Sequence, residues 1–189
     1  MNNFSRIWNK QHGMTTSQFS NTNKLVLGSI LGAIAAILQS AGLLAGVGYV
    51  FSTLATGPII LATILSVRIG LLTYALTPML LMIIQPTEVF VFLFTTGLLA
   101  VGIGIGFKTV KISTLVAVIG GLCLTAGIVI LLTLFNFPVL GPSLTEISVS
   151  VVGGVLAFSI AYSWIWMRIS LIGMKYMNRV IVRHIAYEK

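Results

Sequence analysis

The sequence predicts an all-α integral membrane protein, a bundle of six transmembrane helices whose N- and C-termini are both cytoplasmic. Of the 189 residues, 57% are hydrophobic and only 7% are charged. A soluble domain carries about a quarter charged residues, and with so few it would expose large apolar patches to water. A second observation is that the apolar residues fall into long runs. A third is that the basic residues lie in the two tails and at those ends of the runs that would fall on one side of a membrane.

Six spans are expected from the lengths of the apolar runs. A bilayer core of about 30 Å takes roughly 20 helical residues. After a polar cytoplasmic tail over residues 1–24, the sequence predicts a transmembrane domain over 25–167. Its spans are expected at residues 25–45, 50–67, 69–84, 89–107, 112–135 and 147–167. The second and third spans are short, which leaves them open to be tilted partners, a broken pair or re-entrant segments.

Each span is bounded by a change in the character of the sequence. The first begins after Lys24 and ends in the glycine-rich AGVGYV, and the second ends at Arg68. The third ends at QPTE, because Pro86 cannot continue a helix. The fourth ends at KTVK, the fifth ends at NFPVLGPSLTE, and the sixth is followed by a basic segment that begins with Arg168.

The basic residues orient the bundle. With six spans and a cytoplasmic N-terminus, the outer loops near 46–49, 85–88 and 136–146 contain no Lys or Arg, and they hold Glu88 and Glu146. Because cytoplasmic loops carry an excess of Lys and Arg, both termini are predicted to be inside. We expect a cell membrane, the bacterial plasma membrane, as the location. The inner basic residues are Arg6, Lys10, Lys24, Arg68, Lys108, Lys111, Arg168, Lys175, Arg179, Arg183 and Lys189.

The last segment, 168–189, is expected to be a basic cytoplasmic tail. Arg168, Lys175, Arg179 and Arg183 follow one another at spacings of seven, four and four residues, which places them on one face of a helix. Such a face is typical of an interfacial helix that lies on anionic headgroups. A basic end that only enforces orientation accounts for the same pattern.

The sequence lacks the residues on which most catalytic sites are built. It has no aspartate and a single cysteine, Cys123, and its two histidines, His12 and His184, lie in the tails. Acid–base, nucleophilic and metal-dependent catalysis therefore lack their side chains, so we expect no enzyme, no metal and no cofactor. GIGIGFK, residues 102–108, fails the spacing of a phosphate-binding loop. The net charge of +8 is explained by topology, so the expected partner is the lipid bilayer and not a nucleic acid.

A stripe of small residues marks one face of the first span. Gly28, Gly32, Ala36 and Ser40 are each four residues apart, a spacing that lets a second helix approach closely. That second helix is either a neighbour in the same chain or a helix of a different membrane subunit. The stripe is therefore a candidate partner-helix interface.

The outer side gathers most of the polar groups that are suited to bind a small molecule. Apolar surroundings with a few convergent polar groups are typical of a ligand pocket, although ordinary loops have the same composition. Glu88 is accordingly either a solvated loop charge or a polar anchor at the mouth of an outward pocket. The substrate-binding candidates are Gln39, Tyr49, Gln85, Glu88, Asn136 and Glu146.

The six basic-flanked spans and the small-residue stripe resemble the S components of energy-coupling-factor transporters, which are substrate-binding membrane subunits. The resemblance implies that Gly28, Gly32, Ala36 and Ser40 pack against a membrane coupling subunit driven by cytoplasmic ATPases. It also implies that a vitamin-like small organic solute binds near the outer side, around residues 46–53. The scarcity of titratable groups within the spans argues against a proton-driven transporter. The sequence does not identify the solute.

An alternative function accounts for the same hydropathy and size. In this alternative the protein is a non-transport membrane scaffold or regulator of a cell-envelope or morphogenesis complex. The small-residue stripe and the basic tail would then bind the other members of that complex, and no solute would be bound.

Overall fold

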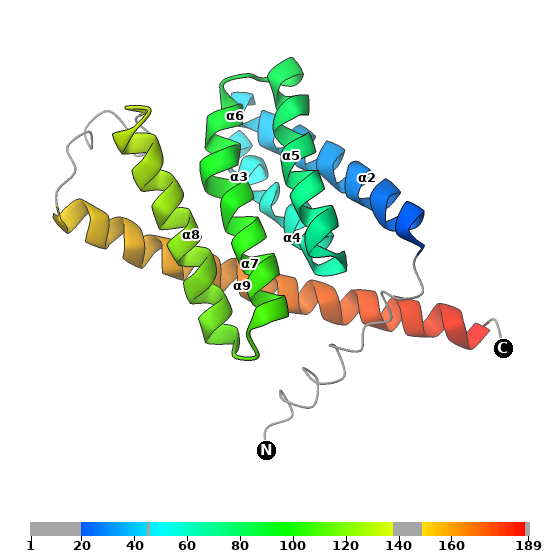
Figure 1. Ribbon diagram of the computed structural model, residues 1–189. Helices are drawn as coiled ribbons and strands as arrows, with labels where there is room; N and C mark the ends of the chain where they lie inside the picture. Colours follow the sequence, from blue (N-terminus) through cyan, green and yellow to red (C-terminus); the bar gives the residue numbers. More distant parts are fainter. Residues whose placement is uncertain (1–19, 45, 138–148, 188–189) are drawn as a thin grey trace.

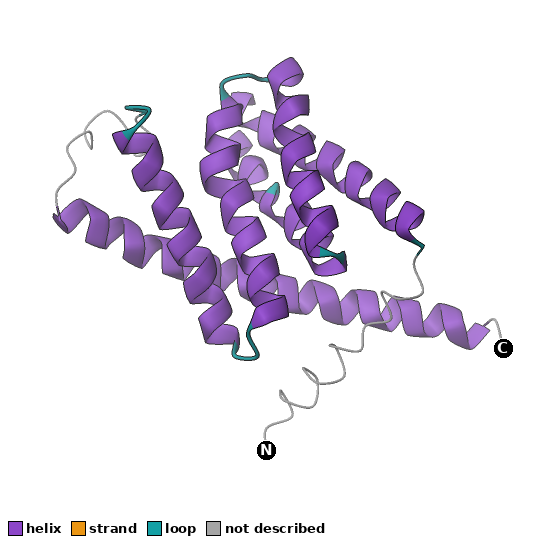
Figure 2. Ribbon diagram, in the orientation of Figure 1, coloured by secondary structure: helices purple, strands orange, loops and turns teal. Residues whose placement is uncertain are grey.

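The computed structural model describes residues 20–44, 46–137 and 149–187, and within these ranges it contains helices and loops but no strand (Figure 2). Six helical stretches are long and apolar enough to cross a membrane, which confirms the predicted all-α class and the predicted number of long apolar helices. These stretches are Asn21–Ser40, Val47–Leu65, Val67–Ile84, Glu88–Thr109, Ser113–Thr133 and Val149–Lys175.

The first span is α2 (Asn21–Ser40), followed by a 3₁₀ turn, η2 (Ala41–Leu44). It begins earlier than expected, because the Ser20 hydroxyl accepts a hydrogen bond from the Asn23 N–H at 3.2 Å and caps the helix. The chain then turns at Gly46, whose φ of 35° is one that residues with a side chain rarely adopt.

The second and third spans are helical along almost their whole length. The second consists of α3 (Val47–Leu54) and α4 (Thr56–Leu65), which are separated only by a tightened turn at Ala55. The third is α5 (Val67–Ile84), and extended Ser66 alone lies between α4 and α5. Arg68 therefore lies in the first turn of the third span, whereas the sequence placed it at the end of the second.

The fourth span changes its hydrogen-bond pattern along its length. It runs as α6 (Glu88–Val91), a π-helical turn η3 (Phe92–Thr96) and α7 (Gly97–Thr109). The fifth span is α8 (Ser113–Thr133). Helix α7 lies in the middle of the bundle, where it packs against α4, α5 and α8 (Figure 1).

The last helix, α9 (Val149–Tyr187), is continuous for 39 residues. At 1.5 Å per residue it is about 58 Å long, roughly twice the thickness of a bilayer core. It packs mainly on α8 and crosses the bundle obliquely (Figure 1). The sequence predicted that a span ends at 167 and a separate tail begins at 168; the backbone has no break there.

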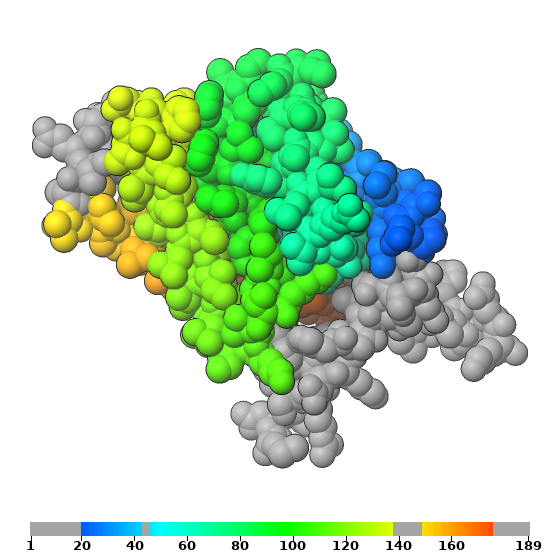
Figure 3. Space-filling model, viewed as in Figure 1, coloured from blue at the N-terminus to red at the C-terminus, as the bar shows by residue number. Residues whose placement is uncertain are grey.

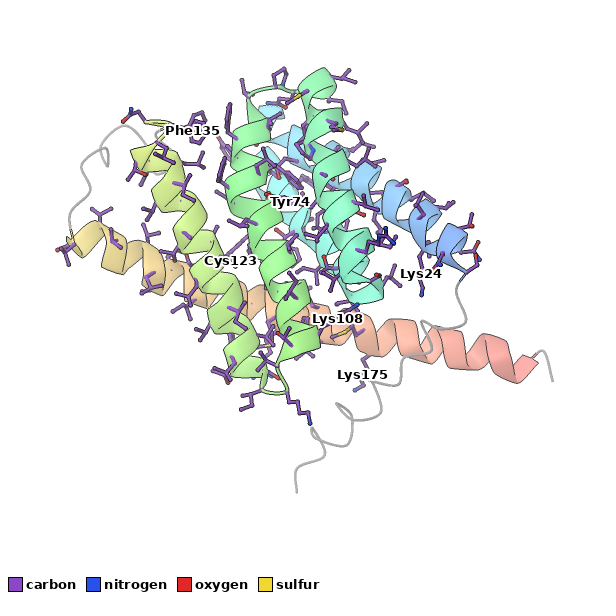
Figure 4. The ribbon with its side chains drawn as sticks, in the orientation of Figure 1. Lys24, Tyr74, Lys108, Cys123, Phe135 and Lys175 are labelled. Atoms are coloured by element: carbon purple, nitrogen blue, oxygen red, sulfur yellow. The ribbon has the colours of Figure 1, made fainter. Side chains whose placement is uncertain are left out.

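Charge is separated along the molecule. Lys24, Lys108 and Lys175 lie toward one end in Figure 4, and Phe135 lies toward the other. The first end is the one predicted to be cytoplasmic, and Glu88 begins the fourth span at the opposite one. These ends are called inner and outer below.

Candidate functional site

Gln39 is the centre of a buried polar cluster near the outer end of the bundle. It lies in the last turns of α2, and its side chain has no exposed surface. Its Nε2 donates to Oε2 of Glu88 at 2.8 Å, and its Oε1 accepts from the Thr96 hydroxyl at 2.9 Å. One amide therefore joins the first span to two points on the fourth. We call Gln39, Glu88 and Thr96 the outer polar cluster.

The position of Glu88 follows from the turn that precedes it. Pro86 prevents α5 from continuing, and the Glu88 N–H donates to the Gln85 carbonyl at 3.1 Å to close a short turn. Glu88 is consequently the first residue of α6 and is half-buried. A Cβ on Gly42 would lie 2.8 Å from the Glu88 Oε1, so η2 passes close to the carboxylate at this glycine.

Thr96 is directed toward α2 by the π-helical turn. A π turn holds one more residue than an α turn and so rotates the residues on either side of it relative to one another. The widened turn is also tied to α5, where the Tyr74 hydroxyl donates to the Leu93 carbonyl at 2.8 Å. Such turns occur frequently at functional sites.

Glu88 has no cationic neighbour among the residues that the structure describes. It is the one acidic residue in the described ranges, and it forms no ion pair there, since Lys24, Lys108 and Lys175 lie toward the inner end (Figure 4). The Gln39 amide is the side-chain donor that meets the carboxylate. The hydrogen bond from Gln39 favours a polar anchor over a freely solvated charge. An outward pocket beside Glu88 stays a prediction.

Gln85 adds a second acceptor beside the same turn. Its side chain is 7% exposed, and its Nε2 donates to the Thr87 hydroxyl at 3.3 Å. Its Oε1 is buried and has no hydrogen-bond partner within the described residues. A buried acceptor left without a donor costs about 1–3 kcal/mol. The outer end therefore offers acceptors and negative charge, which suits a molecule with N–H donors or a positive charge.

The other three binding candidates do not join the outer polar cluster. Tyr49 is 63% exposed on α3. Asn136 is exposed, with φ 48°, after the end of α8. The neighbouring Phe135 packs on Phe90 and Phe94 of the fourth span, with ring centroids 5.1 and 5.4 Å apart. Glu146 lies outside the described residues.

Thr96 is the member of the cluster that sequence reasoning missed. It follows Glu88 by eight residues, which in a regular α-helix places it about 80° around the axis from Glu88. The π turn between them, for which the sequence gives no signal, brings both side chains to Gln39. Within the described ranges no three His, Cys, Asp or Glu side chains gather as a metal site would need.

The small-residue stripe of α2 lies largely against α5. The Thr73 hydroxyl donates to the Gly28 carbonyl at 3.1 Å, and the Thr77 hydroxyl lies 3.4 Å from the Gly32 carbonyl. Ala36 is fully buried, and Ser40 is half-buried. Packing within the chain, one of the two alternatives for the stripe, is thus what occupies Gly28 and Gly32. Docking of a separate subunit stays a prediction.

The topology residues have few contacts. Arg68, Lys108, Lys111 and Lys175 are exposed. Arg168 lies over the Trp164 ring, 5.0 Å from its centroid. Arg179 and Arg183 belong to the helical backbone of α9, and their side chains lie outside the described residues.

Comparisons of the chain with protein-family models, curated proteins and solved structures gave no match. The fold defines a class, an all-helical protein with six helices that are long and apolar enough to cross a membrane.

Proposed function

We propose that this protein is a substrate-binding membrane subunit for uptake of a small organic, vitamin-like solute, and that it works with a separate coupling subunit and cytoplasmic ATPases. The observation that carries the proposal is the outer polar cluster. A fully buried Gln39 holds a carboxylate that has no ion-pair partner in the described part of the chain. Both termini are cytoplasmic in this proposal, and the location is the bacterial plasma membrane.

The chemistry of the cluster supports a solute that donates hydrogen bonds. Glu88 and the unpartnered Oε1 of Gln85 are both acceptors, and a site built from acceptors rejects a molecule without donors. A protonated amine or an N–H-rich heterocycle is the class of solute that fits.

The resemblance to S components supports the assignment of solute binding to this chain and of energy supply to other subunits. The sequence has neither a nucleotide-binding loop nor a set of titratable groups within the spans, so the energy for transport comes from other subunits. Since Gly28 and Gly32 face α5, the coupling subunit binds in this proposal to the face of α2 that is turned away from α5. The exposed residues of that face are Val26, Ile30, Ile34 and Ile37.

The test is to purify the full chain in mild detergent and to identify what it retains. Native mass spectrometry should find a small solute with N–H donors, and a membrane coupling subunit should be recovered with the protein. Glu88→Gln should lower retention of the solute at least tenfold while the protein remains folded, because it removes the charge and keeps the shape. Thr109→Val, at the exposed inner end of α7, is the matched control and should retain the solute.

Recovery of neither a solute nor a coupling subunit would contradict the proposal. Recovery of cell-envelope proteins without a solute would favour the scaffold alternative instead.

A further inference from the structure

The helices α2 and α5 run side by side in the same direction. Cβ atoms built on Gly28 would meet Ile69 and Thr73, whereas one built on Gly32 would meet Leu76 and Thr77. Four residues along α2 thus correspond to about four along α5, which is a parallel register. This register places Lys24, one turn before Gly28, at the level of the first turn of α5.

A groove opens on the outside of this helix pair near its inner end. It has a volume of about 230 Å³, is partly open, and lies mainly between Leu25, Gly28 and Ser29 of α2 and Ile69, Leu72 and Leu76 of α5. In Figure 3 the start of α2 (blue) borders α5 at the edge of the molecule. The groove is smaller than the roughly 300–1,000 Å³ of a pocket for a drug-sized ligand.

The groove presents an apolar surface, because its hydroxyl groups donate elsewhere. The Ser29 hydroxyl donates to the Leu25 carbonyl at 3.1 Å, and the Thr73 hydroxyl donates to the Gly28 carbonyl at 3.1 Å. Neither proton is available to an occupant. The groove therefore suits a flexible hydrocarbon chain, whereas a further helix about 10 Å wide is too broad for it.

The inner end of the groove is basic and has no counter-charge among the described residues. Lys24 and Arg68 directly precede the lining residues Leu25 and Ile69. Lys108, at the end of α7, lies toward the same end of the molecule as Lys24 (Figure 4). The one described acidic residue, Glu88, begins the fourth span at the outer end. A bound anion would balance this positive charge.

We propose that this groove and its basic end form a binding site for one anionic phospholipid. An acyl chain lies along the groove between α2 and α5, and the phosphate contacts Lys24, Arg68 and Lys108. Basic pockets between transmembrane helices on the cytoplasmic side bind such headgroups. The site is independent of the outer polar cluster and of the solute.

The charge half of the site is tested with lipids of known headgroup. The full chain is reconstituted in nanodiscs that contain equal amounts of phosphatidylglycerol and phosphatidylcholine, extracted in mild detergent, and analysed by native mass spectrometry. We expect one phosphatidylglycerol to be retained. The double substitution K24Q/K108Q should lower its retention roughly tenfold or more, since each basic group near an anionic lipid contributes about 1 kcal/mol. Lys111→Gln, at an exposed lysine of the same end, is the matched control and should have no effect.

The groove half is tested separately, with the charges intact. Ser29→Phe fills the groove and should abolish retention of phosphatidylglycerol, whereas Ile30→Phe, at the next position, which is also exposed but does not line the groove, should not. If size-exclusion chromatography shows that Ser29→Phe is not folded, Leu72→Phe replaces it. Equal retention of the two lipids would overturn the proposal, and so would unchanged retention in K24Q/K108Q or in a folded groove-filling variant. Recovery of a polypeptide in place of the lipid would overturn it as well.

Discussion

At the scale of the residue, the Gln39 side chain forms hydrogen bonds through both its N–H₂ group and its carbonyl oxygen. Its N–H₂ group meets a carboxylate and its carbonyl meets a hydroxyl, so no shorter or apolar side chain can replace it without leaving buried partners unbonded. Hydrogen bonds to charged groups are the stronger kind, at about 1.5–3 kcal/mol. The cluster therefore contributes to stability as well as to the proposed binding of the solute.

Gln39→Leu should lower the stability of the folded protein by about 2–4 kcal/mol, because it leaves both Glu88 and Thr96 without their partner. The measurement is the melting temperature in detergent, followed by circular dichroism. Adding Glu88→Gln and Thr96→Val to Gln39→Leu should recover part of the loss, since the unpaired charge and the stranded hydroxyl are then gone. An unchanged melting temperature in Gln39→Leu would mean that the cluster is not formed.

The members of the cluster were only partly predictable. Gln39 and Glu88 stand out in the sequence because polar side chains are rare in apolar runs. Their pairing was not predictable, since it depends on how α2 is rotated against the fourth span. Thr96 was missed because a threonine in a helix usually bonds its own backbone, as Thr95 does with the Val91 carbonyl.

At the scale of the element, pairs of glycines set how closely the helices approach. Thr63 of α4 lies between Gly70 of α5 and Gly104 of α7. A Cβ on Gly70 would lie 2.5 Å from the Thr63 Cα, and one on Gly104 would lie 2.4 Å from its Cβ. Helices in lipid are held together largely by such close van der Waals packing. This contact joins three spans at one residue.

Gly104→Ala should destabilise the bundle by about 1–3 kcal/mol, because the added methyl group forces α4 and α7 apart. Gly153→Ala is the matched control, since nothing lies within 4 Å of a Cβ at that position of α9. Alanine is the better helix former by roughly 1 kcal/mol, so this control should be neutral or stabilising. Guanidinium or heat unfolding in detergent measures both, and equal effects would contradict the close contact at Thr63.

Apart from the inner end of the sixth, the spans were predictable to within a few residues, and the irregular joints between them were not. Apolar run length and bounding residues such as Pro86 located all six helices. The single-residue link at Ser66 and the π turn at Phe92–Thr96 have no comparable signal. Both depend on neighbouring helices that hold the backbone in place, as the Tyr74 hydroxyl does at Leu93.

At the scale of the whole molecule, the basic residues gather at one end of the helical bundle, and their position predicts the topology. The partition of basic residues was read from the sequence, and Lys24, Lys108 and Lys175 do gather toward one end of the fold (Figure 4). The sidedness of that end in a membrane is a prediction from the excess of cytoplasmic Lys and Arg.

Cysteine accessibility tests the sidedness. Cys123 is first replaced by serine, and single cysteines are then introduced by Thr87→Cys, at an exposed position beside Glu88, or by Lys111→Cys, at an exposed position after α7. In intact cells a membrane-impermeant maleimide should label only the Thr87→Cys protein. The Lys111→Cys protein should be labelled after permeabilisation. The reverse pattern would invert the topology and place Glu88 in the cytoplasm.

The backbone of α9 is one unbroken helix from Val149 to Tyr187. A tilt of about 10° around its middle displaces each end by about 5 Å in opposite directions, given a length of about 58 Å. Movement of α8 at the outer side would thus be carried to the basic inner end without any change in backbone conformation along the way. A helix interrupted at residue 168 would absorb that motion at the break and transmit none of it.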